Sequence, residues 1–211
     1  CFDKGKHKLP NVRCETWLGW IYVTLNSKAT PVKKRLAHLE GVASRYRMED
    51  YVGIVSEDHV WDTNWKLLAE NFMEGYHLPV AHRGTVGGFF KASNTRFDAD
   101  APFDAFSYQT FTKTEKAPVG SAHPNNKHLK DEWRYTSILP AIYPSHMIAL
   151  APDHLWYLSL QPQGTNQVRI RYGAAIAPEV LENHADREGF IESTKEFLVR
   201  VNAEDKVVVE G

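Results

Sequence analysis

Four side chains that could bind a metal ion lie within one short segment of the sequence. The segment "NWKLLAENFMEGYHLPVAH", residues 64–82, contains Glu70, Glu74, His77 and His82, and Pro79 stands between the two histidines. Imidazole nitrogens and carboxylate oxygens are common protein ligands of zinc and non-haem iron. The residue types therefore indicate a metal site in this segment.

A less specific explanation treats residues 62–77 as an amphipathic helix that covers a hydrophobic core. At about 100° per residue, its apolar side chains form one stripe, which consists of Trp65, Leu68, Ala69, Phe72 and Tyr76. Glu70, Glu74 and His77 fall on the opposite face, so a solvated acidic surface would explain them without any metal.

Pro79 gives a reason to prefer the metal site. A proline disfavours helical geometry at the residue before it, here Leu78, so we expect the helix to end near His77. His82 could then turn back toward His77, which a straight helix would not allow because residues five apart point about 140° away from each other.

A further candidate ligand lies near the end of the chain, where residues 178–210 have a helical pattern. The apolar side chains of this helix share one arc of roughly 120°, and they are Phe190, Ile191, Thr194, Phe197, Leu198, Val201 and Val208. Asp205 lies in the middle of that arc and Glu204 at its edge. A buried carboxylate is costly unless it is paired or bound to a metal, so Asp205 forms a buried salt bridge or meets His77 and His82.

Two imidazoles and one carboxylate would form the facial triad of non-haem Fe(II) oxygenases. Zinc could use the same ligands with a water molecule in the fourth position. A zinc hydrolase with Glu74 as general base is less consistent with the sequence, because H-E-x-x-H motifs lie on one continuous helix. In this chain the acid precedes the first histidine and a proline interrupts the segment.

The surrounding sequence predicts an α+β domain. Strand patterns and helix patterns alternate with turns along the chain: strands at 15–26, 46–61 and across 133–177, a helix at 30–40 with Thr30 and Pro31 at its start, a helix beginning at Asp62 or Thr63, and a loop-like stretch over 78–130. We expect an antiparallel sheet that wraps around the long C-terminal helix.

Composition excludes several functional classes. The chain has 211 residues, which suits one domain, and its formal net charge of −1 gives no basis for a nucleic-acid or anionic-membrane partner. No window approaches the roughly 18 apolar residues of a transmembrane helix. With only Cys1 and Cys14, a reducing cytoplasmic location is expected. The first residue is not methionine, and we expect residues 1–211 to be part of a longer protein, truncated at both ends.

The motifs resemble those of one enzyme family. The N-W-K, E-N and H-x4-H elements of residues 64–82 resemble the core motif of Rieske non-haem iron ring-hydroxylating oxygenase α-subunits. The segment "AEDKVVVE", 203–210, resembles the part of that family that carries the third iron ligand, and "WLGWIYVTLN", 17–26, resembles the strand after its Rieske domain. The resemblance implies the helix-grip fold and covers nearly the whole chain.

The resemblance also implies roles for individual residues. His77, His82 and Asp205 would bind mononuclear Fe(II), and Glu74 would be the carboxylate that links His77 to the Rieske cluster of a neighbouring subunit. Asn71 matches an asparagine near the iron. The family further implies a homotrimer that receives electrons from a Rieske domain and a reductase and that hydroxylates a small molecule with O2, giving a cis-diol or an alcohol that leads to demethylation.

Two departures from the family pattern refine this expectation. The C-x-H and C-x2-H ligands of a Rieske [2Fe–2S] cluster do not occur in the sequence, so the cluster is expected only in a missing N-terminal domain, and the chain should not turn over alone. The "EGYH" of residues 74–77 is closer to the branch that acts on choline, betaine or carnitine than to the naphthalene-type enzymes. The substrate would therefore be an aromatic or quaternary-ammonium molecule.

A metal-free alternative remains open at this point. The helix-grip fold also serves ligand-binding modules in which the histidines would be ordinary polar groups of an apolar cavity. Candidate pocket residues in either case are Phe72, Val80, Phe89 and Phe90. The other histidines are expected to be surface groups or satisfied core groups; they are His7, His38, His59, His123, His128, His146, His154 and His184.

Overall fold

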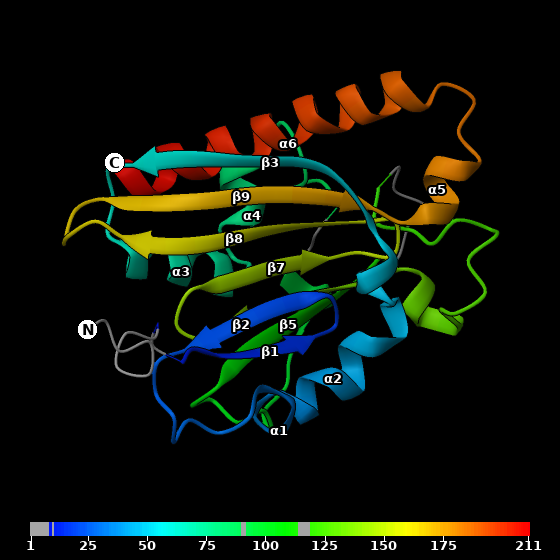
Figure 1. Cartoon of the computed structure of the whole chain (residues 1–211). Helices are drawn as coiled ribbons and strands as arrows, with labels where there is room; N and C mark the ends of the chain where they lie inside the picture. The colour runs from blue at the N-terminus through cyan, green and yellow to red at the C-terminus, as the bar shows by residue number, and fades with distance from the viewer. Residues whose placement is uncertain (1–8, 10, 90–91, 114–118) are drawn as a thin grey trace, which may run out of the picture.

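The computed structural model describes residues 9, 11–89, 92–113 and 119–211. Its centre is a seven-stranded antiparallel sheet with the order β3-β9-β8-β7-β6-β5-β4 (Figure 1). The strands are β3 (Val52–Trp61), β4 (Thr95–Phe97), β5 (Phe106–Thr112), β6 (Thr136–Ile142), β7 (His146–Leu150), β8 (His154–Pro162) and β9 (Val168–Ile176). The predicted meander over residues 133–177 is confirmed as β6 to β9, and the α+β fold class is confirmed with it.

Helices and one small hairpin cover the sheet. The hairpin is β1 (Arg13–Trp17) and β2 (Trp20–Thr24), and the helices are α1 (Val32–Arg35), α2 (Ala37–Ala43), α3 (Trp65–Met73), α4 (Leu78–Ala81), α5 (Pro178–Glu182) and α6 (Arg187–Glu210). Short 3-10 turns lie at Ser44–Tyr46, Met48–Asp50, Ala92–Asn94 and Asp131–Arg134. In Figure 1 the hairpin and α2 lie in front of the sheet, and α3, α4 and α6 lie behind it.

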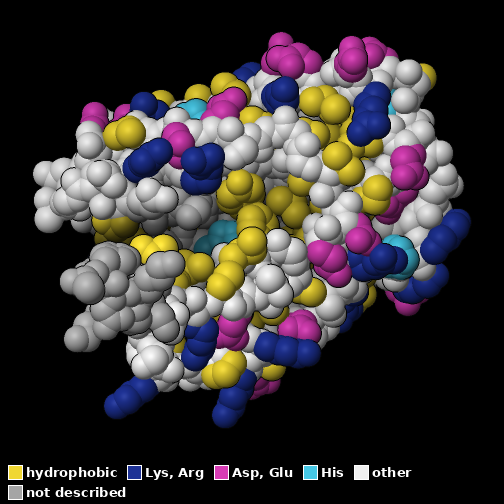
Figure 2. All heavy atoms as spheres, viewed as in Figure 1, with side chains coloured by type: hydrophobic (Ala, Val, Ile, Leu, Met, Phe, Trp, Pro, Cys, Tyr) yellow, Lys and Arg dark blue, Asp and Glu magenta, His cyan; other side chains and the backbone are white. Residues whose placement is uncertain are grey.

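The sheet carries a hydrophobic core on each face. Along β7, Met147 packs into the core shared with α3 and α6, whereas Ile148 packs into the core shared with α2 and the hairpin. Both side chains are fully buried, and the pattern follows from the two-residue period of a strand. On the face seen in Figure 2, hydrophobic side chains gather in the hollowed middle and charged side chains surround it.

The N-terminal part differs from the sequence prediction in two places. The single strand expected at 15–26 is a hairpin, because Leu18 and Gly19 both have positive φ (43° and 88°) and form its two-residue turn. The helix expected at 30–40 is divided into α1 and α2 at Leu36. Pro31 precedes α1 as its N-cap and is not the first helical residue.

The expected loop over 78–130 is also wrong in part. It contains α4, β4 and β5, and β5 pairs with β6 over its whole length, from Phe106 opposite Ile142 to Thr112 opposite Thr136. The sequence of β5, "FSYQTFT", has aromatic side chains at positions 106, 108 and 111, which do not share one face of a strand, so no clear period-2 pattern indicated it.

The C-terminal helical pattern is two helices. The segment 183–186 separates α5 from α6, and the Asp186 carboxylate caps α6 by accepting a hydrogen bond from the backbone N–H of Gly189 at 2.9 Å. Along α6, Leu198, Val201, Asp205 and Val209 are buried. Val208, which the helical wheel placed in the apolar arc, is 47% exposed, and its neighbour Val209 is buried instead. Among the described residues, no helix is both long and apolar enough to cross a membrane.

Candidate metal centre

The first candidate segment folds as a short helix with a sharp end. Asn64 caps α3, since its side-chain oxygen accepts a hydrogen bond from the backbone N–H of Lys66 at 2.8 Å. The prediction of a cap at Asp62 or Thr63 was therefore displaced by one or two residues. The helix ends at Met73, earlier than the predicted end near His77, and Glu74 has extended backbone angles (φ −114°, ψ 155°).

Because α3 ends at Met73, the helical wheel does not apply to residues 74–77. Leu68, Ala69 and Phe72 are buried as predicted, but Tyr76 lies beyond the helix and is 78% exposed. Glu74 therefore does not belong to a solvated helix face. It lies in the connection between α3 and α4, where its position depends on tertiary contacts.

The two histidines flank the short helix α4. His77 is its N-cap and His82 its C-cap, and Pro79 lies in its first turn. A proline is well suited to the first turn because its missing N–H would have no helical partner there. Leu78 is consequently helical, contrary to the expectation from Pro79, and one turn of helix brings the imidazole rings to a centroid distance of 5.2 Å.

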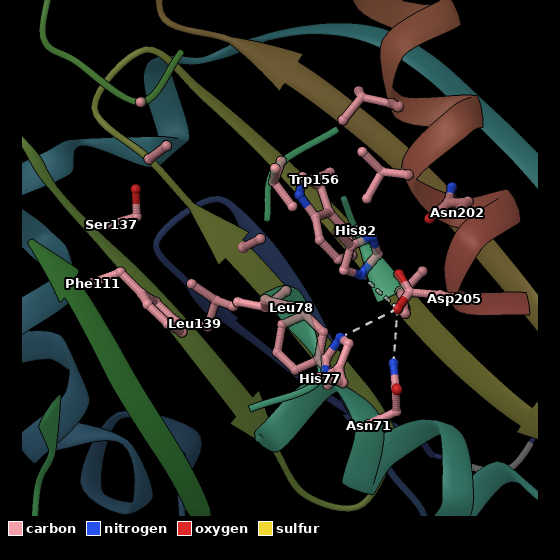
Figure 3. Close-up of a pocket in the computed structure, with 18 of the residues that line it drawn as sticks. Asn71, His77, Leu78, His82, Phe111, Ser137, Leu139, Trp156, Asn202 and Asp205 are labelled. Carbon is pink, nitrogen blue, oxygen red and sulfur yellow. Dashed lines mark hydrogen bonds and ion pairs between the residues drawn. The ribbon is translucent and has the colours of Figure 1, made fainter. Parts of the chain in front are cut away.

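Asp205 on α6 meets both histidines. Its Oδ1 lies 3.0 Å from His82 Nε2 and 3.5 Å from His77 Nε2. Figure 3 shows the three side chains converging at one side of a pocket. One ligand atom from each residue lies within 4.8 Å of the other two, which is compatible with binding a single metal ion. No Arg or Lys pairs with Asp205 among the described residues, so the salt-bridge explanation is not supported.

Each imidazole is held from behind by a carboxylate. His77 Nδ1 is hydrogen-bonded to Glu74 Oε1, and His82 Nδ1 is hydrogen-bonded to Glu204 Oε2 at 2.8 Å. Thr85 Oγ1 also donates to Glu204 Oε2. Because Nδ1 is occupied in both rings, Nε2 is the nitrogen left to face Asp205. Metal-binding histidines usually have such a partner, which fixes the ring and its tautomer.

Two further predicted residues complete the cluster. The second oxygen of Glu74 accepts hydrogen bonds from the backbone N–H groups of Tyr76 and His77, at 2.8 and 3.1 Å. These bonds fix the turn between α3 and α4. Asn71 Nδ2 donates to Asp205 Oδ1 at 2.9 Å. The structure thus brings together all five predicted site residues.

Electrostatics in the cluster favour opposite charges on His82 and Asp205. Burial alone raises the pKa of Asp205, but hydrogen bonds from His77, His82 and Asn71 outweigh it and lower the pKa to about 2. Burial likewise acts to lower the pKa of His82, and its contacts with Asp205 and Glu204 raise the pKa above its usual value. Asp205 is therefore negatively charged at neutral pH, as a carboxylate ligand of a metal ion must be.

The cluster lies at one side of an apolar pocket between the sheet and α6 (Figure 3). Side chains from the sheet and the helices line it, among them Phe72, Leu139, Trp156, Leu158 and Leu198. Of the predicted pocket residues, Phe72 is confirmed. Val80 and Phe89 are 67% and 38% exposed and do not line the pocket, because they lie in and after α4, on the outer side of the segment that carries the histidines. Phe90 lies outside the described residues.

Two further groups at this site were not predicted from the sequence. Glu204 was placed only at the edge of the helical arc, yet it holds His82; its position directly before Asp205 was the available signal. His154 lines the pocket, and its Nδ1 is 2.7 Å from Asp153 Oδ1. Several of the other histidines have polar partners, as predicted; His38, for example, is 2.7 Å from Asp98 Oδ2. His7 lies outside the described residues.

A comparison with known protein families identifies the family of this chain. The family model described as "Ring hydroxylating alpha subunit (catalytic domain)" matches residues 43–211. The chain belongs to this family. The match begins at the end of α2 and includes the whole sheet, α3, α4 and α6, so it contains all five residues of the cluster.

Two curated proteins share part of the sequence. The glycine betaine monooxygenase oxygenase subunit of Chromohalobacter salexigens is 29% identical over 94 residues, which is 44% of this chain and 21% of that protein. The carnitine monooxygenase oxygenase subunit of Acinetobacter baumannii is 29% identical over 90 residues, which is 39% of this chain and 23% of that protein.

Solved structures confirm the helix-grip fold. The quaternary ammonium Rieske monooxygenase CntA, in a complex with gamma-butyrobetaine, matches 99% of this chain with a TM-score of 0.69 at 17% identity. Naphthalene 1,2-dioxygenase from Rhodococcus sp. matches 96% with a TM-score of 0.60, also at 17% identity. This chain spans 51% and 55% of those chains. At such low identity the likeness establishes the fold and no substrate.

The donor set fits the non-haem iron of this family. Two imidazole nitrogens and one carboxylate form the facial set that Fe(II) accepts, and both outer nitrogens are already hydrogen-bonded to carboxylates. A structural zinc site would require a fourth protein ligand. The described residues offer three ligands whose donor atoms lie close enough together.

Proposed function

We propose that this chain is the catalytic domain of a Rieske-type oxygenase that binds one Fe(II) ion through His77, His82 and Asp205. The observation that carries the proposal is the shared orientation of the two imidazoles. Each has its Nδ1 fixed by a carboxylate and its Nε2 directed at the same oxygen of Asp205. A metal-free ligand-binding module would have no need for two histidines held in this way.

Fe(II) bound there would supply the redox chemistry that O2 activation requires. The residues of the chain have separate tasks. Asp205 provides negative charge, and Asn71 holds one of its oxygens. Phe72, Leu139 and Trp156 keep the adjoining space apolar, so that water is largely excluded where the substrate lies.

We propose that Glu74 connects this centre to its electron donor. It is bonded to His77 and to the backbone around it, and its side chain remains 21% exposed. An electron arriving from a [2Fe–2S] cluster in a Rieske domain, itself reduced by a reductase, would have the Glu74–His77 hydrogen bond as a direct route. Placing that domain on a neighbouring subunit would require an oligomer, and the homotrimer remains our proposal for the assembly.

The reaction we propose is O2-dependent hydroxylation of a small molecule. Both possible reactions consume O2, two electrons from the reductase and two protons. In a monooxygenation, one oxygen atom enters a C–H bond and the other leaves as water; in a cis-dihydroxylation, both oxygen atoms enter the substrate as hydroxyl groups. Trp156 and Phe72 both line the pocket, and their rings pack edge-to-face with centroids 5.6 Å apart. Aromatic side chains suit an aromatic ring or, through cation–π contact, a quaternary ammonium group. The two curated relatives are named for quaternary ammonium substrates, which favours the second class.

A zinc hydrolase with Glu74 as general base is less compatible with this geometry. Both oxygens of Glu74 are already engaged, one with His77 Nδ1 and the other with two backbone N–H groups. A general base must have an oxygen within reach of the attacking water, and Glu74 lies behind His77, on the side away from Asp205.

Anaerobic titration of the purified chain with Fe(II) tests the proposal. We expect about one ion per chain, and affinity reduced more than roughly 100-fold in His77→Ala and Asp205→Ala, since even outer-shell partners are worth up to that factor. Matched controls are His59→Ala and Asp58→Ala, two replacements of the same types on β3. Equal iron binding by the wild type and by both site variants, with all proteins folded by circular dichroism, would refute the facial triad.

A further inference from the structure

A second group of polar side chains lies at the part of the pocket opposite the metal cluster. Ser137 on β6, His154 at the start of β8 and the backbone at Gly120 line this part. In Figure 3, Ser137 is separated from His77, His82 and Asp205 by the apolar side chains of the pocket. Nothing in the proposed iron chemistry requires polar groups at this distance from the triad.

Two buried donor groups here lack a partner. Lys113 Nζ and Ser137 Oγ are inaccessible to solvent and make no hydrogen bond to any residue that the structure describes. Lys113 as a whole is only 8% exposed and Ser137 only 4%. Leaving a buried ammonium without an acceptor is among the costlier arrangements in a protein, so these atoms call for an external partner.

The two unpartnered groups lie close together around Gly120. A Cβ built on Gly120 would lie 2.9 Å from Lys113 Nζ and 3.4 Å from Ser137 Oγ. Gly120 has a φ of +74°, which residues with a side chain rarely adopt. The glycine thus allows the ammonium and the hydroxyl to approach the same point of the pocket wall without obstruction.

Asp153 supplies charge nearby but does not satisfy the ammonium. Its Oδ2 accepts from the backbone N–H of Gly120 at 2.6 Å, and its Oδ1 is 2.7 Å from His154 Nδ1. Burial raises the pKa of Asp153, but His154, Gly120 and Lys113 outweigh this and keep the pKa below its usual value. Burial lowers the pKa of Lys113 to about 8, so the ammonium form still predominates at neutral pH.

We propose that Lys113 and Ser137 form a subsite for a carboxylate group at the end of the substrate farthest from the metal. A carboxylate has two oxygens, one for the ammonium and one for the hydroxyl, and it would remove both unsatisfied donors at once. His154 borders the same place, held by Asp153 through Nδ1. The subsite rests on the proposed function, because it assumes that this pocket holds the substrate.

The charge of the subsite favours a monoanion. The Lys113 ammonium and the Asp153 carboxylate both lie beside Gly120, a residue of the pocket wall. A phosphate or another dianion would meet repulsion from Asp153 without a second cation to offset it. The predicted substrate is therefore an elongated molecule with one carboxylate at one end and the carbon to be hydroxylated at the other, close to Asp205.

Binding measurements with matched acids and amides test the subsite. The probes are phenylacetate, phenylpropanoate, phenylbutanoate, glycine betaine and gamma-butyrobetaine, each compared with its amide by calorimetry on the purified chain at about pH 7. At least one acid should bind about 10- to 100-fold more tightly than its amide, the factor that corresponds to one charge-assisted hydrogen bond. If no acid binds more tightly than its amide, including the case in which nothing binds, the proposal is wrong.

Variants assign the preference to the two residues. Lys113→Met should abolish it, and Ser137→Ala should reduce it about tenfold. Lys113→Met removes an unpartnered buried charge, so its thermal midpoint should equal or exceed that of the wild type, and loss of binding cannot come from unfolding. Lys195→Met, at the partly exposed Lys195–Glu192 pair of α6, is the matched control. A preference that survives Lys113→Met would overturn the assignment.

The same experiment distinguishes failure of the subsite from failure of the proposed function. Each titration is run on the metal-free chain and on the chain with Fe(II). Iron binding without any preference for acids leaves the oxygenase proposal in place and refutes the subsite. A preference for acids in a chain that binds no Fe(II) supports the subsite and refutes the iron-dependent function.

Discussion

From the burial of His146 we predict a specific dependence of the unfolding free energy on pH. The imidazole lies at the start of β7, where the hairpin packs on the sheet, and its ring is 4.5 Å from that of Trp20 in an edge-to-face arrangement. Burial lowers the pKa of His146 to about 4. Burial also raises the pKa of Tyr22 far above its usual value, so the Tyr22 hydroxyl keeps its proton and donates it to neutral His146 Nδ1 at 2.8 Å.

The size of this pH effect on the unfolding free energy follows from the difference in proton binding between the folded and the unfolded chain. A histidine in the unfolded chain has a pKa of about 6.5. Between about pH 6.5 and pH 4 the unfolded chain binds a proton at His146 that the folded chain does not, so stability rises with pH in this window. Relative to pH 7, His146 should cost about 2 kcal/mol of unfolding free energy at pH 5 and about 3 kcal/mol at pH 4.

Urea unfolding of the wild type and of His146→Gln measures this cost. Glutamine retains an acceptor for Tyr22 and cannot be protonated, so the variant should gain about 2 kcal/mol on the wild type between pH 7 and pH 5. All other titrating groups cancel in this difference. His59→Gln on β3 shows how much of the change follows from removing any one imidazole. If wild type and His146→Gln lose the same free energy between pH 7 and pH 5, His146 is not buried as a neutral base and the reasoning fails.

Two further predictions concern the segment that holds His82. Glu204→Ala should weaken Fe(II) binding about 10- to 100-fold, because it frees the His82 imidazole to rotate. Glu196→Ala, on the exposed face of α6, should leave Fe(II) binding unchanged. Equal affinities of the two variants would contradict the role of Glu204. Gly87→Ala should also weaken Fe(II) binding, since its Cβ would clash with the carbonyl oxygens of Leu78 and His82. Unchanged affinity in a folded variant would show that this backbone adjusts without moving the His82 ring.

The part of the site that could be predicted from sequence depended on burial. Asp205 could be found because a carboxylate in an apolar helical arc needs a partner, and the structure shows it buried against two histidines. The meander of β6 to β9 was predictable for a related reason, since its apolar residues alternate between two cores. The meander itself was inferred from strand signals over residues 133–177 that prolines interrupt.

Local chain direction could not be predicted from the same patterns. The helical wheel predicted that α3 would continue to His77. Instead, the backbone at Glu74 is extended, and the Glu74 carboxylate accepts hydrogen bonds from two backbone N–H groups and is hydrogen-bonded to His77. Those bonds exist only once the turn has formed, so sequence periodicity contains no sign of them. Pro79 was equally ambiguous, since a proline can end one helix or begin the next, and here it begins α4.

The geometry of the metal cluster depends on how α6 is fixed to the segment before α3. Thr63 Oγ1 donates to the backbone oxygen of Val209 at 2.6 Å, and the backbone N–H of Asp62 donates to Glu210 Oε1 at 2.8 Å. These bonds fix the C-terminal end of α6 only a few residues from the start of the helix that leads to His77. Asp205 lies one turn before Val209, so the same contacts place its carboxylate. A change that loosens this attachment should therefore disturb the site before it unfolds the sheet, because the backbone pairing of β5 to β8 does not involve α6.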